Sequence, residues 1–506
     1  HRIRRLRQRM MGHDGALSPK EDSCDGTVHR LVFDKLKSPK DVHEALCRQS
    51  VEIVLTAHPT EVNRRTMLAK HQRVKEILEA FDRADNSPYE IRQLNRQLHS
   101  EIASIWETDE LRRSKPTPVE EARGGLNVVE NVLWRAVPDF LRKLDDVSKA
   151  QLGEPLPLDV APIKMASWMG GDRDGNPNVT PAITKEVCNI SRWTAARLFL
   201  GDIRTLQKEL SVRGASDELI EYSKGAREPY RYVLKELEQR LTETVKWTEE
   251  NAVTGQTTPL DETQIFTNTA ELMEPLQMMH QSLISQGRPE IADGLLTDTI
   301  RRLAAFGLSM LPLDLRQESS RHAEALDAIT QRLELGSYLS WDETTRREWL
   351  CKEISSKRPL LPKGTPLRKL GFSDTVVDTL ETFELVAKLT PGSLGAYVIS
   401  QCQQASDVLA VTLLQIDAGV LEPLRVVPLF ETLDDLERSA ATMEALFSMP
   451  AYKDHIRGKQ EIMVGYSDSA KDAGRLAASW AQYKCQEEMV QIGANHGIEL
   501  TFFHGK

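Results

Sequence analysis

The feature that most constrains the fold is a series of short apolar runs separated by longer segments with helical periodicity. Seven such runs, each about the length of a buried strand, cover residues 51–57, 162–168, 308–316, 395–401, 425–430, 461–466 and 498–503. The runs are largely continuous rather than alternating, which is typical of parallel strands covered on both faces. Between them, segments such as 65–84 and 230–247 carry apolar residues at the spacing of an amphipathic helix.

This order of elements predicts an α/β fold, a TIM-type (β/α)8 barrel that is helix-rich overall. Such a barrel has eight strands, so the chain would supply seven of the eight. A standard barrel needs about 250 residues, whereas the chain has 506. We therefore expect residues 1–506 to form a single, incomplete unit of barrel and large, mostly helical insertions rather than three independent domains. The polar, proline-containing segment 109–124 is expected to be a surface loop.

Composition and charge argue against several classes of protein. The hydrophobic fraction of 40% and the charged fraction of 28% are ordinary for a globular protein. A net charge of −10 argues against a nucleic-acid partner. No apolar run approaches the ~18 residues that a membrane span needs. The six cysteines are widely spaced and form no C-x-x-C pair, which favours reduced thiols in an intracellular, cytoplasmic protein over a disulfide scaffold or a zinc site.

The first residues, HRIRRLRQRMM, are strongly basic. A transit peptide or a nucleic-acid-binding arm would have this character. Because the run is short and acidic residues follow it, we favour one basic helix face of a longer chain.

Ionisable side chains follow six of the seven predicted strands. The first strand ends at His58, where Pro59 disfavours the helical conformation. The later strand ends carry the segment GGDRDGNP after Trp168, which contains Arg173, then Arg316, Glu431, Asp468 with Lys471, and His504. In a barrel all these positions meet at the carboxyl ends of the strands, where active sites are built. Each residue alone has a simpler explanation, such as a turn, a solvated carboxylate or an Arg316–Glu318 ion pair, but their repetition favours an active site.

The residue types at these positions indicate a class of chemistry. Glu431 and Asp468 have no cysteine or histidine cluster nearby and suit a hard divalent ion, Mg²⁺ or Mn²⁺. Arg316 and Arg173 offer fixed cations for a phosphate or carboxylate group. His58 titrates near neutral pH and can move a proton. Together they predict phosphoryl chemistry or the stabilisation of an enolate.

Several long motifs resemble one known family. They are TAHPTEVNRRT, SWMGGDRDGNPNVT, LDLRQES, GSLGAYVISQCQQASDVLAVTLL, PLFETLDDL and GYSDSAKDAGRLAASWAQY, and they occur in the order found in phosphoenolpyruvate carboxylases. The resemblance runs through nearly the whole chain and corresponds to the middle part of a family member. It implies that the family's N-terminal segment and C-terminal part lie outside these residues.

The resemblance implies carboxylation of phosphoenolpyruvate by bicarbonate, giving oxaloacetate and inorganic phosphate through carboxyphosphate and a metal-stabilised enolate, with Mg²⁺ or Mn²⁺. By this resemblance His58 accepts the carboxyl proton of carboxyphosphate, Glu431 and Asp468 hold the metal, and Arg316 holds phosphate. Lys471 matches a lysine of the family's second active-site signature.

The resemblance also implies binding positions around these groups. Trp168, Leu429 and Met463 match an apolar pocket for CO₂ or bicarbonate, a setting that protects reactive intermediates from water. The full set of expected substrate-binding residues is Trp168, Arg173, Leu429, Met463 and His504. A sugar-phosphate activator site of plant-type members is matched by Arg64, Arg65 and Arg112.

Lys506 stands where the family has the arginine of a glycine-rich closing loop, and a lysine keeps the charge but loses the bidentate fork. The family is tetrameric and allosteric, so a homo- or hetero-oligomer that contacts the family's C-terminal part is expected. Two other interpretations stay open: a non-catalytic regulatory or scaffolding subunit with the same fold, and another metal-dependent lyase that acts on a phosphorylated enol. The intact set of His58, Glu431, Asp468, Arg316 and Lys471 favours the carboxylase.

Overall fold

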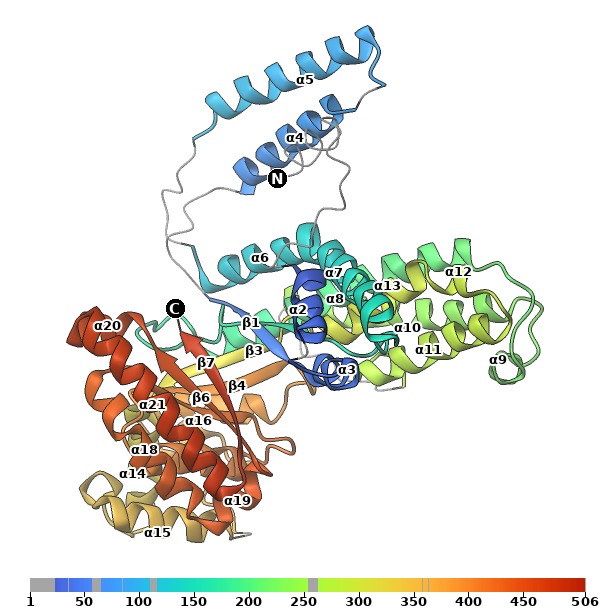
Figure 1. Ribbon diagram of the computed structural model, residues 1–506. Helices are drawn as coiled ribbons and strands as arrows, with labels where there is room; N and C mark the ends of the chain where they lie inside the picture. Colours follow the sequence, from blue (N-terminus) through green and yellow to red (C-terminus); the bar gives the residue numbers. More distant parts are fainter. Residues whose placement is uncertain are drawn as a thin grey trace.

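A single parallel sheet lies at the centre of a helix-rich molecule (Figure 1). The computed structural model describes residues 23–34, 36–56, 65–83, 85–109, 116–253, 263–356, 358–362 and 364–505. The strands are β1 Val51–Leu55, β2 Ile163–Ser167, β3 Leu313–Glu318, β4 Leu394–Ser400, β5 Arg425–Phe430, β6 Lys459–Gly465 and β7 Glu499–Gly505. Each strand pairs in parallel with the next one along the chain, in the order β1 to β7. This curled sheet confirms the predicted strands and is compatible with an α/β barrel.

One predicted strand is shifted along the chain. The run 308–316 was expected to be the third strand, whereas β3 spans Leu313–Glu318. The chain turns at the start of this run, because Met310 has a φ of 58° and the Leu311 N–H donates to the Ser309 carbonyl at 2.7 Å. Apolar character alone does not distinguish this buried turn from a strand.

Helices make up most of the remaining described residues. Their bounds are α2 Cys24–Phe33, α3 Pro39–Arg48, α4 Arg65–Phe81, α5 Pro88–Trp106, α6 Pro118–Val128, α7 Trp134–Val147, α8 Pro181–Glu209, α9 Asp217–Tyr222, α10 Pro229–Val253, α11 Thr269–Ser285, α12 Pro289–Ala292, α13 Leu295–Phe306, α14 Ser319–Arg332, α15 Glu343–Ile354, α16 Asp374–Val386, α17 Ala405–Ala418, α18 Leu433–Phe447, α19 Pro450–Ile456, α20 Ser467–Ala473 and α21 Arg475–His496. The helices predicted within 65–84 and 230–247 are confirmed as α4 and α10.

The predicted surface loop 109–124 is wrong in its second half, where α6 begins at Pro118. Thr117 caps this helix: its side chain accepts from the Glu120 N–H, and the Glu120 carboxylate accepts from the Thr117 N–H. Threonine followed by proline and, three positions on, glutamate is a helix-start signature. The segment was predicted to be a loop because it is polar and contains prolines. Residues 110–115 of it lie outside the described ranges.

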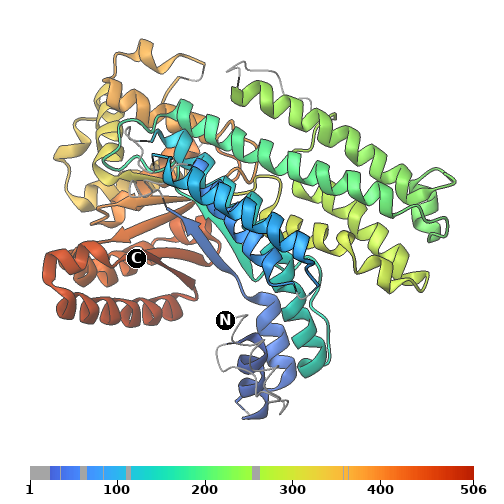
Figure 2. The ribbon, with the colours of Figure 1, turned by 90° about the horizontal axis from the view of Figure 1, so that it is seen from above.

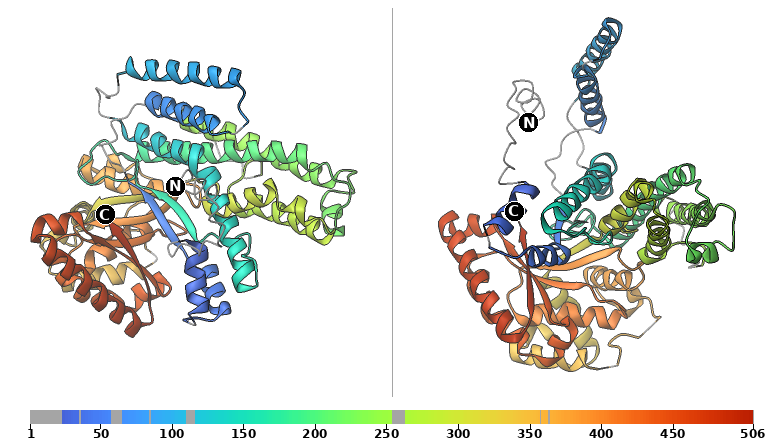
Figure 3. Two further views of the ribbon diagram at one scale, coloured as in Figure 1. Left: turned by 45° about the horizontal axis from the view of Figure 1, so that its top comes forward. Right: turned by 45° about the vertical axis from the view of Figure 1, so that its right-hand side comes forward.

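The helices form separate layers around the sheet. Helices α8 to α13 extend away from one edge, as Figures 1 and 2 show, and pack around a buried core that includes Trp134, Phe199 and Leu241. Helices α14 to α19 and α21 cover one face of the later strands (Figure 3). Helices α4 and α5 pair with each other and project from the rest of the molecule (Figure 3, right). Among the helices in the described ranges, none combines the length and the apolar character that a membrane span requires.

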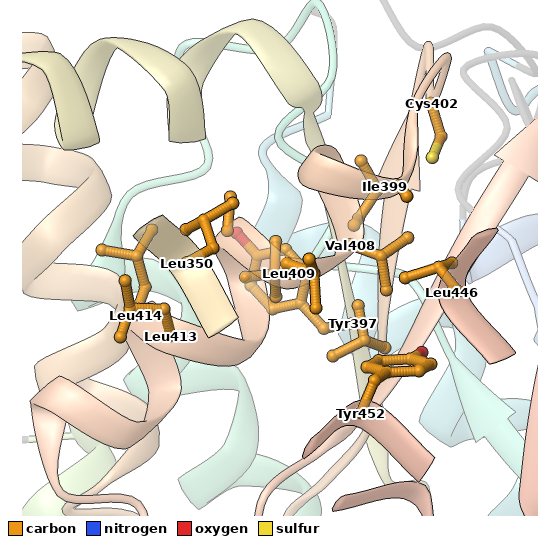
Figure 4. Close-up of a cluster of buried hydrophobic side chains, with 14 of the residues drawn as sticks. Leu350, Tyr397, Ile399, Cys402, Val408, Leu409, Leu413, Leu414, Leu446 and Tyr452 are labelled. Atoms are coloured by element: carbon orange, nitrogen blue, oxygen red, sulfur yellow. The ribbon is translucent and has the colours of Figure 1, made fainter. Parts of the chain in front are cut away.

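The sheet buries apolar side chains on both faces, as the continuous apolar runs predicted. On the outer face, Tyr397 and Ile399 of β4 lie among the helix residues Val408 and Leu409 (Figure 4). On the inner face lies a smaller apolar cluster of Trp168, Ala396, Val398, Val427, Leu429 and Met463. Successive residues of β4 alternate between the two faces, as strand geometry requires. All six cysteines are free thiols in this structure.

Candidate active site

Arg316 points to the inner face of β3 and is held by carboxylates that follow β2. Its Nε and Nη2 atoms donate to the two carboxylate oxygens of Asp172 at 2.8 and 3.1 Å, and Nη2 lies 3.6 Å from Asp174 Oδ2. The backbone fixes this arrangement, because the Arg316 N–H donates to the Gly171 carbonyl at 3.0 Å. The Arg316–Glu318 ion pair left open by the sequence is not formed; Arg316 pairs with Asp172 instead.

Glu431 follows the last residue of β5 and lies among charged groups from other strand ends. Its Oε1 accepts from the Gln401 N–H at 3.0 Å. Burial raises the pKa of the Glu431 carboxyl, the Gln401 N–H and Arg316 lower that pKa, and Asp174 and Asp468 raise it. The two predicted metal ligands, Glu431 and Asp468, therefore lie within electrostatic range of each other and of Arg316.

Asp468 and Lys471 lie on α20, directly after β6. The Lys471 Nζ atom is 3.1 Å from Asp468 Oδ1, and both side chains are largely exposed to solvent. An exposed pair of this kind contributes at most about 1 kcal/mol to stability, so Lys471 is available to other anions. The ends of β5 and β6 approach closely because Gly465 has no side chain: a Cβ atom there would lie 3.2 Å from the Glu431 Cα.

The three residues predicted to form an apolar pocket lie together on the inner face. Trp168, Leu429 and Met463 belong to the same buried cluster, and Leu429 and Met463 are neighbours on β5 and β6. The guanidinium of Arg316 lies 5.0 Å from the centre of the Trp168 ring. Phe503 meets the same ring edge-on at 5.6 Å. The apolar cluster is thus directly continuous with the charged strand ends.

Arg173 is not brought to this group. Its side chain is 7% exposed, and its guanidinium donates to Thr184 Oγ1 at 2.7 Å and to the Gly171 carbonyl at 3.3 Å. Burial lowers the pKa of Arg173, and Tyr397 on the outer face of the sheet is the largest opposing influence. In this structure Arg173 supports the turn after β2 from within the protein.

Of the remaining predicted site residues, the structure describes the side chain of His504. His504, near the end of β7, is exposed, and its Nδ1 lies 2.7 Å from the Tyr466 hydroxyl. His58, Arg64 and Arg112 lie outside the described residues, as does the side chain of Arg65.

The site carries more negative than positive charge among its described residues. Four carboxylates, those of Asp172, Asp174, Glu431 and Asp468, gather around the cations Arg316 and Lys471. In the described ranges no group of three or more histidine, cysteine or acidic residues is arranged to hold a metal ion. A pair of carboxylates is nevertheless what Mg²⁺ usually takes from a protein, the rest of its shell coming from water and substrate oxygens. The oxygen donors and the surplus negative charge therefore fit a hard divalent cation.

Sequence reasoning missed the roles of Asp172, Asp174 and Gln401. The two aspartates stand in the segment GGDRDGNP, which was noted as a strand end but not as the partner of Arg316. A carboxylate on either side of Arg173 was the available signal. Gln401 offered none, because its backbone N–H is the group that contacts Glu431.

Comparison with known proteins shows the family of the chain. A family model described as phosphoenolpyruvate carboxylase matches residues 1–506. The chain is 48% identical to the phosphoenolpyruvate carboxylase of Acinetobacter baylyi over 483 residues, which cover 94% of this chain and 54% of that protein. It is 47% identical to the phosphoenolpyruvate carboxylase of Pseudomonas aeruginosa over 511 residues, which cover 100% of this chain and 56% of that protein. The chain thus spans about half the length of the curated relatives it matches. It belongs to the phosphoenolpyruvate carboxylase family.

Proposed function

We propose that the intact protein carrying this chain joins bicarbonate to phosphoenolpyruvate, giving oxaloacetate and inorganic phosphate. The observation that supports this most directly is the position of Arg316, Glu431 and Asp468 at the carboxyl ends of three strands of one parallel sheet. Membership of the phosphoenolpyruvate carboxylase family supports the assignment of this reaction to these residues. The proposal includes a (β/α)8 barrel of which residues 1–506 form one unit with helical insertions, an oligomeric assembly and a cytoplasmic location.

Glu431 and Asp468 would hold the divalent cation, with Mg²⁺ or Mn²⁺ as the candidates. Both residues offer hard oxygen donors, and the surrounding charge is negative, so the residues present fit such an ion. When bound, the cation would supply positive charge opposite the oxygens on which negative charge develops.

Side chains of the protein would bind the phosphate group, accept the proton and exclude water. Arg316, held in a fixed orientation by Asp172, would bind the phosphate group, and Lys471 would add a second cation near it. A bicarbonate oxygen would attack phosphorus, breaking the bond between phosphorus and the enolate oxygen. His58 would then accept the carboxyl proton of carboxyphosphate, which releases CO₂ and phosphate. The pocket of Trp168, Leu429 and Met463 would keep water from the CO₂ and the enolate.

A coupled assay tests the proposal. Oxaloacetate and phosphate are measured together, with bicarbonate present and omitted and with Mg²⁺ present and chelated. We expect both products to require bicarbonate and the metal. Product formation that ignores bicarbonate, or purified intact protein that forms no oxaloacetate under any of these conditions, would overturn it.

The role of His58 has its own test. In the His58→Asn variant, phosphate release should persist while oxaloacetate formation is lost, because the first step does not need this imidazole. Equal loss of both products would contradict the assignment.

A further inference from the structure

A carboxylate that the proposed reaction does not use lies buried on the inner face of β3. Asp314 is 2% exposed and stands two positions before Arg316. Its Oδ1 accepts from the Ala396 N–H at 2.6 Å, and its Oδ2 accepts from the Trp168 indole N–H at 3.2 Å. One side chain therefore connects three elements: β3, β4 and the residue that follows β2.

The neighbouring strands are shaped around this carboxylate. A Cβ atom at Gly395 would lie 2.3 Å from Asp314 Oδ1, and a Cβ atom at Gly171 would lie 2.0 Å from the Asp314 carbonyl oxygen. Real Cβ atoms do not approach other atoms so closely, so a side chain at Gly171 would require a shift of the backbone and one at Gly395 would displace the Asp314 carboxylate. The close packing holds Asp314 in one place.

The buried surroundings of Asp314 disfavour the charged form of its side chain. Burial raises its pKa to about 7; the Ala396 N–H and Arg425 act to lower that pKa, and Glu52 and Glu461 act to raise it. Arg425 is itself shared between Glu52 at 3.1 Å and Glu461 at 3.3 Å. A buried carboxyl group costs free energy that its hydrogen bonds must offset, and Asp314 makes two of them, to the Ala396 N–H and the Trp168 indole N–H. The second of these bonds links Asp314 to the candidate site.

Trp168 is the residue through which Asp314 reaches the site. The Trp168 ring supports the Arg316 guanidinium at 5.0 Å and forms part of the apolar cluster with Leu429 and Met463. An indole ring held by its N–H has one orientation, whereas a ring held by apolar contacts alone can rotate or tilt. The orientation of this ring therefore affects both Arg316, the expected phosphate-binding residue, and the packing of the apolar cluster.

We propose that Asp314 is a positioning residue that fixes the Trp168 ring through its indole N–H and thereby keeps CO₂ beside the enolate. This inference rests on the proposed function. If the ring is loosened, CO₂ escapes before the new carbon–carbon bond forms, and the enolate takes a proton from water to give pyruvate. Phosphate is still released in that case, so the loss appears in the ratio of the carbon products.

The test replaces Asp314 by asparagine in the intact protein. Asparagine has the same shape but one acceptor oxygen, and it faces two donors, the N–H groups of Ala396 and Trp168. We expect the pyruvate-to-oxaloacetate ratio to rise roughly fivefold, the change that corresponds to losing one ordinary hydrogen bond. Phosphate release should fall much less than oxaloacetate formation.

Asp145→Asn is the matched control. Asp145 is also a buried carboxylate, 6% exposed, and it accepts from the Leu156 N–H at 2.9 Å and pairs with Arg301 at 3.0 Å and Lys149 at 2.8 Å, but it lies on α7 among the helices. Both variants should lose thermal stability, and only Asp314→Asn should change the product ratio. A structural role alone would move the melting temperature of both and the product ratio of neither.

Trp168→Phe completes a double-mutant cycle. It removes the indole N–H and keeps an aromatic ring, so it should raise the pyruvate share by itself. Adding Asp314→Asn should then change the ratio less than about twofold, because the two substitutions remove the same bond. If Asp314→Asn alone does not fold, Trp168→Phe carries the test, because it removes the same hydrogen bond from the other side, and an unchanged pyruvate share in that variant overturns the positioning role.

The outcomes separate the two proposals. A product ratio in Asp314→Asn equal to that of the wild type or of Asp145→Asn overturns the positioning role and leaves the carboxylase intact. Additive effects of the two substitutions also overturn it. Wild-type protein that forms neither oxaloacetate nor bicarbonate-dependent phosphate overturns the proposed function itself.

Discussion

Replacement of Arg316 by lysine is the sharpest test of the candidate site. Arginine binds Asp172 through two parallel hydrogen bonds at 2.8 and 3.1 Å, and its planar guanidinium lies over the Trp168 ring. Lysine keeps the positive charge but offers a single ammonium group, which reproduces one of these hydrogen bonds and little of the ring contact. The substitution therefore removes geometry rather than charge.

The size of the effect follows from those contacts. One lost hydrogen bond between charged groups corresponds to about 1.5–3 kcal/mol, and the weakened contact with the ring to about 0.5–1 kcal/mol. We expect Arg316→Lys to lower the free energy of unfolding by roughly 2–4 kcal/mol. If the same guanidinium binds phosphate, one lost bond in the transition state lowers kcat/KM for phosphoenolpyruvate by about 10–100-fold.

Arg302→Lys is a closely matched control. Arg302 pairs with Asp202 at 2.7 Å and lies 5.1 Å from the centre of the Trp134 ring, in the helical region away from the strand ends. Its pair is buried at 10% and 14% side-chain exposure, against 20% and 22% for Arg316 and Asp172, so its loss of stability should be at least as large. Chemical denaturation gives the stability of each variant, and steady-state kinetics per folded molecule give kcat/KM.

Only Arg316→Lys should lose kcat/KM beyond the fraction that is unfolded. If both lysine variants lower kcat/KM alike, or if Arg316→Lys leaves it unchanged while destabilising the fold, Arg316 has a structural role and the assignment to phosphate is wrong.

Three further predictions concern the metal, the pocket and acid stability. Glu431→Gln should raise the Mg²⁺ concentration for half-maximal activity at least roughly 10–100-fold, as measured by metal titration, and an unchanged value would exclude it as a ligand. Met463→Gln places an amide in the inner apolar cluster and Met489→Gln places one in the outer core; both should destabilise by about 1–3 kcal/mol, but only the first should raise the share of pyruvate among the products. His322 is fully buried with its Nε2 2.8 Å from the Tyr397 hydroxyl, and burial lowers its pKa to about 3. Because the unfolded chain binds this proton first, stability should fall by up to ~1.4 kcal/mol per pH unit as the pH drops below 6.5, and urea denaturation of His322→Gln should show a shallower acid dependence than the wild type.

The strands were predictable because their signal is local. Seven continuous apolar runs fell on the seven strands, and the parallel pairing follows from the helices between them. The errors have local causes as well. A left-handed residue at Met310 moved the start of β3, and the cap at Thr117 began a helix inside a segment that is polar enough to resemble a loop.

The site was only partly predictable because its contacts join residues far apart in sequence. Glu431, Asp468 and Arg316 could be predicted from their positions at strand ends, because the carboxyl ends of parallel strands lie on the same side of the sheet. The partner of Arg316 could not be chosen in the same way: Glu318 is close in sequence, whereas Asp172 is 144 positions away and is brought near by strand pairing. The role of Asp314 could not be predicted for a similar reason. Its partners Trp168 and Ala396 are distant in sequence, and a carboxylate within a strand is ordinarily expected to face solvent.

Trp168 lies where two requirements of the proposed reaction meet. Its ring supports Arg316, the expected phosphate-binding group, and also belongs to the apolar cluster expected to hold CO₂. The two tasks therefore cannot vary independently. A substitution that tilts the ring should weaken phosphate binding and CO₂ retention together, whereas one at Met463 should affect retention alone. The correlation between KM for phosphoenolpyruvate and the share of pyruvate, compared between Trp168→Phe and Met463→Gln, is thus a direct measure of how tightly one side chain couples both steps.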